Sequence, residues 1–163
     1  MSECLVTPAA PPAPERLELA VVSAADLPLL ERLVRAYYVE DGHTFHGDRQ
    51  PAALAALAAG EPFGRAWLTL LDRRLVGYVV LSWGFSVEAG GREACVDEIY
   101  LVPEVRNRGR GSRVLALLEA EARAVGVRRV FLEVERHNRA IGLYRRAGYV
   151  DHDRFLMSKF LDR

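Results

Sequence analysis

The sequence predicts an α+β fold: a single domain with one mixed, mostly antiparallel sheet, flanking helices and a central strand–helix–strand crossover. Three observations support this prediction. The 163 residues suffice for one domain. Runs rich in β-branched and aromatic residues alternate with amphipathic stretches of helical spacing. The runs at 94–102 and 129–135 flank a long helix, which is the connection that parallel strands need.

The N-terminal part is expected to supply a tail, a strand and two helices. Residues 1–15 contain four prolines among alanines, a composition that resists regular structure, so we expect a flexible tail before a domain over 16–163. Ser23 and Asp26 resemble a capping box and predict a helix start. The elements expected here are a strand over 17–22, a helix reaching about Glu40 and a short helix from Pro51 to Gly60.

The rest of the chain is expected to form a hairpin, the crossover and a final strand. Asp72-Arg73-Arg74 separates two β-rich runs, as in an antiparallel hairpin, and Gly90-Gly91 indicates a second turn. Pro103 should end the third strand of this group. The predicted elements are strands over 66–71, 75–85, 94–102, 129–135 and 155–160, and helices over 109–125 and 139–147.

Charge and composition exclude several classes of protein. The 22 basic and 22 acidic residues cancel, which argues against gripping nucleic acid with an overall basic surface. No apolar run approaches the ~20 residues of a membrane-spanning helix, so we expect no membrane partner. Two cysteines cannot build a disulfide scaffold, and the N-terminus lacks the pattern of a signal peptide. We therefore expect a cytoplasmic protein.

The basic residues cluster at one place, between a predicted strand and a predicted helix. A glycine-rich turn lets a backbone approach a ligand closely, and the first turn of a helix presents unpaired N–H groups. Such a site binds phosphate, and flanking arginines strengthen it. Neither the triphosphate P-loop nor the full dinucleotide fingerprint is present. The cluster consists of Arg106, Arg108, Arg110 and Arg113, interleaved with Gly109 and Gly111.

The segment 106–111 has the pattern R-x-x-G-x-G, and a second block over 138–149 has the pattern N-x-A-x-x-L-Y-x-x-x-G-Y. Together they resemble the GNAT superfamily of acetyl-CoA-dependent N-acetyltransferases. The resemblance implies that acetyl-CoA binds the loop through its pyrophosphate and the preceding strand through its pantetheine arm. Asn138 stands six residues before Tyr144, where the family more often has seven, so its role stays open. The implied cofactor-binding residues are Ile99, Tyr100, Leu101, Arg106, Asn107, Arg108, Gly109, Arg110, Gly111, Ser112, Asn138 and Tyr144.

The resemblance also implies direct attack of an amine on the thioester, in a cleft between the strands at 94–101 and 129–135. Tyr144 is then the candidate general acid for the thiolate. Glu98 and Glu133 are both candidate bases, because each is an acidic residue in an otherwise apolar strand. Strict alternation along a strand would point Asp97 and Glu98 to opposite faces. The candidate substrate-binding residues are Glu98, Asp97, Tyr38 and Trp83.

The predicted activity is transfer of an acetyl group to a primary amine, either a small polyamine-like molecule or a protein amine. The motifs are nearest to polyamine- and diamine-type and to ribosomal-protein N-terminal acetyltransferases. A homodimer is plausible within that family, and no metal is expected, because the histidines lack paired ligand spacing. Two alternatives remain: a non-catalytic acyl-CoA-binding regulatory module, and nucleic-acid binding by the arginine-rich loop. The zero net charge weighs against the second.

Overall fold

The computed structural model describes residues 15–161 and contains one five-stranded sheet. The strands follow one another across the sheet in chain order, antiparallel from β1 to β4, with β5 parallel to β4. This confirms the predicted α+β class and its single crossover. The strands are β1 (Leu17–Val21), β2 (Gly64–Leu71), β3 (Arg74–Ser86), β4 (Gly91–Leu101) and β5 (Arg129–Leu132).

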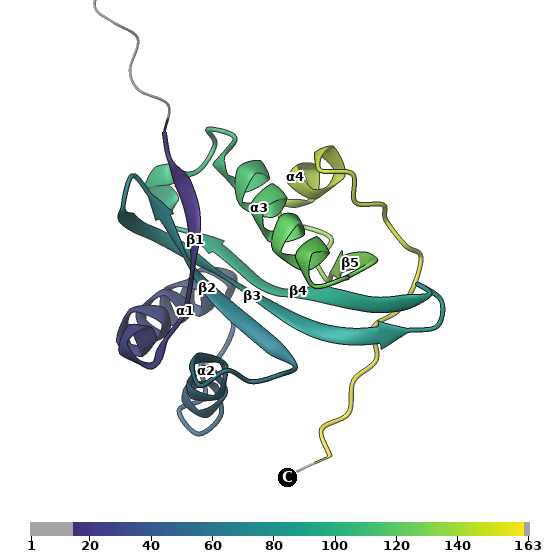
Figure 1. Ribbon diagram of the computed structural model, residues 1–163, viewed down its shortest axis with the longest axis horizontal. Helices are drawn as coiled ribbons and strands as arrows, with labels where there is room; N and C mark the ends of the chain where they lie inside the picture. The colour runs from purple at the N-terminus through teal and green to yellow at the C-terminus, as the bar shows by residue number, and fades with distance from the viewer. Residues whose placement is uncertain (1–14, 162–163) are drawn as a thin grey trace, which may run out of the picture.

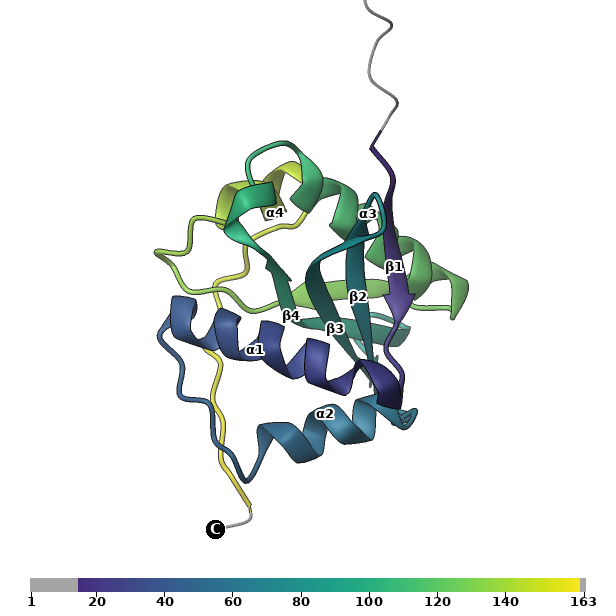
Figure 2. The same cartoon turned by 90° about the vertical axis from the view of Figure 1, so that its left-hand side faces the viewer.

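Helices cover both faces of the sheet (Figure 1). The helices are α1 (Leu27–Asp41), α2 (Gln50–Ala58), α3 (Arg110–Ala124) and α4 (Ile141–Arg146). One face packs against α3 around Val114 and Leu118, and the other packs against α1 and α2 around Leu30 and Leu54. Figure 2 shows α1 and α2 lying one beside the other on their face of the sheet. The sheet is therefore a wall between two separate apolar cores.

Local signals placed most element boundaries correctly. The Asp26 carboxylate accepts hydrogen bonds from the Ser23 N–H (2.9 Å) and hydroxyl (2.7 Å), so the predicted capping box forms, ahead of a short 3₁₀ turn that leads into α1. Asp72 and Arg73 both have positive φ angles, 48° and 65°, as the two-residue turns that suit a twisted hairpin require.

Two predictions differ from the structure. β5 ends at Leu132, three residues before its predicted end at 135. The predicted strand over 155–160 is wrong: this segment has no regular secondary structure and pairs with no strand among residues 15–161. Its apolar composition favours an extended chain, but a strand also needs an adjacent edge to bond with. The predicted tail over 1–15 lies, except for Glu15, outside the described residues.

β4 contains a β-bulge at Asp97, which shapes the site described below. Val80 of β3 lies opposite Glu98 and Leu81 lies opposite Val96, so Asp97 has no residue opposite it. A bulge adds one residue to one strand, bends that strand and breaks its alternation. Residues before and after Asp97 therefore keep their separate registers with β3.

Candidate active site

The pairing between β4 and β5 stops halfway along β4. The last paired residues are Val96 and Leu132, whereas β4 continues to Leu101. Within residues 15–161, the edge of β4 from Asp97 onward that faces away from β3 therefore has no strand partner. Unpaired main-chain groups at such an edge can bond to an extended ligand. This unpaired edge lies where a cleft between the two strands is expected from the sequence.

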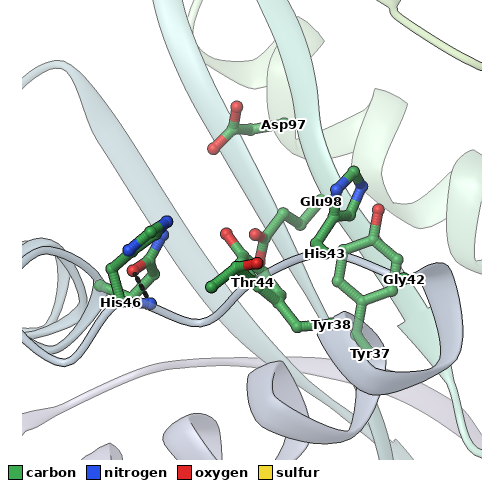
Figure 3. A pocket seen from close by; sticks show the side chains of 9 residues that line it. Tyr37, Tyr38, Gly42, His43, Thr44, His46, Asp97 and Glu98 are labelled. Carbon is green, nitrogen blue, oxygen red and sulfur yellow. Dashed lines mark hydrogen bonds between the residues drawn. The ribbon is translucent and has the colours of Figure 1, made fainter.

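A cavity of about 640 Å³ opens on the α1 side of β4. The α1–α2 connection supplies its outer wall, and β4 supplies two carboxylates at its base (Figure 3). Two tyrosines from α1 and two histidines from the connection complete most of the lining. These residues are Tyr37, Tyr38, His43, His46, Asp97 and Glu98.

Asp97 and Glu98 both face this cavity, contrary to the prediction from strict alternation (Figure 3). The bulge explains the difference. Val96 and Ile99 pack toward α3, and the two residues between them both turn toward α1. The sequence argument assumed an unbroken period of two, which holds on either side of Asp97 but not across it.

Glu98 is held at the base of the cavity by a buried phenol. The Tyr78 hydroxyl donates a hydrogen bond of 2.8 Å to Oε2 of Glu98, and Tyr78 is 0% exposed. Burial raises the pKa of the Glu98 carboxyl, and the Tyr78 and Tyr38 hydroxyls oppose that rise by stabilising the charged form. A carboxylate with a raised pKa in a cavity suits proton abstraction near neutral pH.

Asp97 lies nearer to solvent than Glu98 does. Its side chain is exposed, yet loss of hydration against the cavity wall raises its pKa. The neighbouring Asp97 charge also contributes to the raised pKa of Glu98. Two carboxylates that share one cavity make it a favourable place for a cation.

Tyr144 lies on α4 and is not among the residues that line this cavity, but it is close enough to Asp41, at the end of α1, to feel its charge. Burial raises its pKa, and the charge of Asp41 raises it further, so the phenol keeps its proton at neutral pH. Its ring meets the Tyr149 ring edge-on, with the centroids 6.0 Å apart. A protonated, half-buried tyrosine meets the requirements of a general acid.

Like Tyr144, the other two residues predicted for catalysis or acceptor binding, Glu133 and Trp83, do not line this cavity. Glu133 follows the last residue of β5 and is exposed. Trp83 lies farther along β3 and lines a second pocket, near the end of α2. The structure thus gathers Tyr38, Asp97 and Glu98 in one cavity but leaves Tyr144, Glu133 and Trp83 outside its lining.

The loop before α3 has the geometry expected of an anion cradle. Asn107 and Gly109 have positive φ angles of 60° and 72°, and no side chain among residues 15–161 caps the start of α3. The first-turn amides of α3, from Arg110 to Ser112, thus lack intrahelical acceptors. A Cβ on Gly111 would lie 3.0 Å from a methyl group of Leu143, so this glycine lets α4 pack close to the cradle. The open amides and the close backbone fit a pyrophosphate.

Three of the four clustered arginines already have protein partners: Arg113 donates to the Glu15 carbonyl (2.7 Å), and Arg106 and Arg110 make the following contacts. The Arg106 guanidinium bonds to the Leu101 carbonyl (2.7 Å) and forms a two-armed ion pair with Glu40 at the end of α1. Arg110 is 4% exposed and pairs with Glu15 before β1, and its guanidinium also donates to the Val105 carbonyl (3.0 Å). These two side chains fix the loop to the sheet and to α1.

Arg108 and Asn138 complete the predicted cofactor set. Arg108 is exposed beside the cradle, at the place where a flanking cation would meet a phosphate. Asn138 uses its side-chain oxygen to accept a 2.8 Å hydrogen bond from the Ala140 N–H, which shapes the turn before α4. In this arrangement Asn138 supports α4 and hence Tyr144.

Sequence reasoning missed two residues that shape the site. Tyr78 positions Glu98, and Glu40 anchors Arg106. Tyr78 could have been noticed in the sequence, because it is a phenol within the apolar run Leu75–Leu81 and a buried tyrosine hydroxyl usually has a hydrogen-bond partner. The sequence contains no signal for the role of Glu40, because it resembles any acidic residue at the end of a helix.

Comparisons with known proteins identify the family. Residues 28–149 match the acetyltransferase (GNAT) family. The chain is 28% identical, over 83% of its length and 88% of the relative's, to an IAA acetyltransferase from Azospirillum brasilense. The chain belongs to the GNAT acetyltransferase family and is an acyltransferase.

Solved structures show the same fold. An integron cassette protein from the mobile metagenome of Cole Harbour Salt Marsh is 32% identical, with a TM-score of 0.76 over 89% of this chain and 91% of that one. A predicted acetyltransferase from Clostridium acetobutylicum, solved with acetyl-CoA, is 16% identical, with a TM-score of 0.69 over 88% and 96% of the two chains. Among residues 15–161, no helix is long and apolar enough to cross a membrane.

Proposed function

We propose that this protein transfers an acetyl group from acetyl-CoA to a primary amine by direct attack in a ternary complex. One observation carries the proposal: the unpaired edge of β4 joins an acidic cavity at Asp97 and Glu98 to the cradle before α3. Donor and acceptor bound at these two places would meet along one strand, which supplies the positioning that a two-substrate reaction needs. Family membership and a structural neighbour solved with acetyl-CoA support the choice of donor.

The donor would bind through main-chain groups. Its pyrophosphate would accept hydrogen bonds from the first-turn amides of α3, with Arg108 as the flanking cation. Its pantetheine arm would lie along the unpaired edge of β4, and a main-chain N–H between Ile99 and Leu101 would polarise the thioester carbonyl. Arg106 and Arg110 would act indirectly, because their ion pairs hold the loop in place.

The chemistry removes two protons from the acceptor nitrogen and adds one proton to the departing sulfur. Glu98 would take a proton from the acceptor's ammonium group, directly or through one water, and so free the nitrogen lone pair. The nitrogen–carbon bond then forms at the thioester carbonyl, the carbon–sulfur bond breaks, and Tyr144 donates a proton to the departing thiolate. The nitrogen gives up its second proton to the Tyr144 phenolate, directly or through one water, which leaves a neutral amide and restores the phenol. Burial favours both roles, because it raises the pKa of the Glu98 carboxyl and keeps Tyr144 protonated.

Glu133 is the weaker candidate for the base. It is exposed and lies beyond β5, outside the cavity, whereas Glu98 is half-buried at the cavity base beside Tyr38 and Tyr78. A role for Glu133 would need a chain of waters from the cleft. The comparison of Glu98→Gln with Glu133→Gln tests this, since only the first should lower turnover by the 10²- to 10⁴-fold typical of a lost general base.

The acceptor is proposed to be cationic. Asp97 and Glu98 both face the cavity, so one carboxylate can neutralise a second positive group while the other receives the proton. Tyr37 and Tyr38 add aromatic walls against which a cation packs favourably. A small polyamine-like molecule and an amine of a protein chain both satisfy this chemistry, and the cavity opens toward solvent.

Self-association is a further part of the proposal. The C-terminal segment exposes large apolar side chains, with Phe155 91% and Met157 89% exposed. A contiguous exposed apolar patch is typical of a protein–protein contact, which supports a homodimer. Cytoplasmic location stays a prediction from the sequence.

Thiol release from acetyl-CoA over a panel of amines tests the proposed function. The panel should include diamines, longer polyamines, aminoglycosides and peptides with free N-termini, beside uncharged monoamines. Release with at least one cationic amine is expected, together with CoA binding measured by calorimetry. Tight CoA binding without turnover of any amine would favour the non-catalytic acyl-CoA-binding module instead.

A further inference from the structure

We propose that Tyr78 is a positioning residue that fixes the Glu98 carboxylate as the proton acceptor of the site. This inference rests on the proposed acetyl transfer, and it assigns a role to a residue that never contacts either substrate. The argument has three parts: where the Tyr78 hydroxyl points, what prevents it from moving, and what else faces Glu98.

The hydroxyl reaches Glu98 because of the register of β3 and β4. Tyr78 lies opposite Tyr100, and Glu98 is two residues from Tyr100 on the same face of β4. A diagonal neighbour of this kind lies within reach of an aromatic side chain. The Tyr78 hydroxyl donates to Oε2 at 2.8 Å, and we assign the other oxygen, Oε1, to the acceptor's proton.

The ring of Tyr78 is packed on several sides. Its centroid lies 6.1 Å from that of Tyr100 and 6.5 Å from that of Tyr37, and the residue is 0% exposed. Burial and the Glu98 charge raise the pKa of Tyr78 far above its usual value, so it remains a hydrogen-bond donor throughout the working pH range. A donor held this firmly keeps the carboxylate in one orientation without reorganisation during the reaction.

The other groups around Glu98 do not replace this contact. Tyr38 comes from α1, His43 from the α1–α2 connection and Asp97 from β4 itself, and all three line the open cavity. Tyr38 and His43 favour the charged form of Glu98, while Asp97 opposes it. Tyr78 is the fully buried member of this set, and it approaches from the side of the sheet.

The test is a Tyr78→Phe variant, which keeps the ring and removes only the hydroxyl. Without this donor the carboxylate holds its proton more tightly, so the acidic limb of the kcat/KM profile should move to higher pH. Loss of a hydrogen bond to a charged group should shift the midpoint of this limb by about one to two pH units. Turnover at neutral pH should fall, while the KM for acetyl-CoA should change little.

Tyr149→Phe is the matched control. The Tyr149 hydroxyl is buried and has no hydrogen-bond partner within residues 15–161. Its loss should therefore leave the pH profile of kcat/KM unchanged. An acidic limb that stays unmoved in Tyr78→Phe would overturn the proposal. So would a shift of equal size in both variants.

A double-variant cycle separates positioning from general loss of stability. If Tyr78 acts through Glu98, Tyr78→Phe should lower turnover in the parent but have no further effect in a Glu98→Gln background. Equal losses in both backgrounds would overturn the assignment.

The titration of Glu98, followed by NMR of the labelled carboxyl, supplies a readout that needs no turnover. Its midpoint should move upward in Tyr78→Phe. If no amine is acetylated but the titration still moves, the proposed function fails while the contact between Tyr78 and Glu98 stands. If the midpoint does not move, this inference fails whatever the activity.

Discussion

Deleting Asp97 should remove the bulge in β4 while leaving the fold intact. Val80 already lies opposite Glu98 and Leu81 already lies opposite Val96, so joining Val96 to Glu98 gives β3 and β4 one continuous register. Val96 and Ile99 would keep facing α3, and Glu98 would keep facing α1. The side chain of Asp97 has no hydrogen bond to another residue within 15–161, so the deletion breaks no such contact.

The expected change in stability is small and the expected change in activity is large. Closing the bulge restores at most one or two ladder hydrogen bonds, each worth about 0.5–1.5 kcal/mol net. Removing its bend should let β4 run on beside β5, which closes the edge that the donor needs. A misplacement of about 1 Å can cost roughly 100-fold in rate, so transfer should fall at least that far.

Two controls make the result interpretable. Asp97→Ala keeps the bulge and removes only the carboxylate, so it should raise the KM for a cationic amine and leave acetyl-CoA binding unchanged. Deleting Ile99 either exchanges the faces of Tyr100 and Leu101 or moves Glu98 into the core beside α3. Either change should lower the free energy of unfolding by roughly 3 kcal/mol or more.

Urea unfolding and thiol-release kinetics on all three variants provide the measurement. The bulge argument is refuted if the Asp97 deletion transfers acetyl groups as fast as Asp97→Ala. It is also refuted if the Asp97 deletion unfolds as readily as the Ile99 deletion.

Three further predictions concern the cradle and the two proton-transfer residues. Gly109→Val should abolish CoA binding and lower the free energy of unfolding by about 1–2 kcal/mol, because a φ of 72° strains any side chain. Gly111→Val should lower stability by a different route, through a close contact with Leu143. Normal CoA affinity in Gly109→Val, measured by calorimetry, would contradict the first prediction. Tyr144→Phe should lower turnover with little loss of CoA affinity, and unchanged kcat across the pH range would remove Tyr144 as the acid. Burial raises the pKa of Glu98, so its ionised form destabilises the fold, and wild-type stability should fall as pH rises above the ordinary value of 4.5. Glu98→Gln should lack that part of the fall in chemical unfolding at several pH values, and an identical pH dependence would show that Glu98 is not buried as described.

Features that depend on neighbouring residues could be predicted from the sequence. The capping box at Ser23, the hairpin turn at Asp72 and the crossover through α3 all follow from short patterns and their spacing. The glycine-rich start of α3 belongs to the same class, and its two glycines turn out to serve different purposes. Gly109 provides a left-handed backbone, whereas Gly111 provides room for Leu143.

Features that depend on contacts between distant segments could not be predicted from the sequence. The bulge at Asp97 leaves no glycine in the sequence. Its one trace is the adjacent acidic pair Asp97-Glu98 between Val96 and Ile99, which strict alternation wrongly assigned to opposite faces. The pairing of Arg106 with Glu40 joins two segments 66 residues apart. The segment at 155–160 has the composition of a strand, but whether it pairs depends on an edge that its own sequence does not specify.

The most direct test of the account is thiol release from acetyl-CoA by the wild-type protein, compared with Gly109→Val and Glu98→Gln. The account predicts release that depends on a cationic amine, is lost in Gly109→Val together with CoA binding, and is reduced in Glu98→Gln with CoA binding intact. Release that persists at the wild-type rate in Glu98→Gln, or CoA that binds Gly109→Val normally, would contradict it.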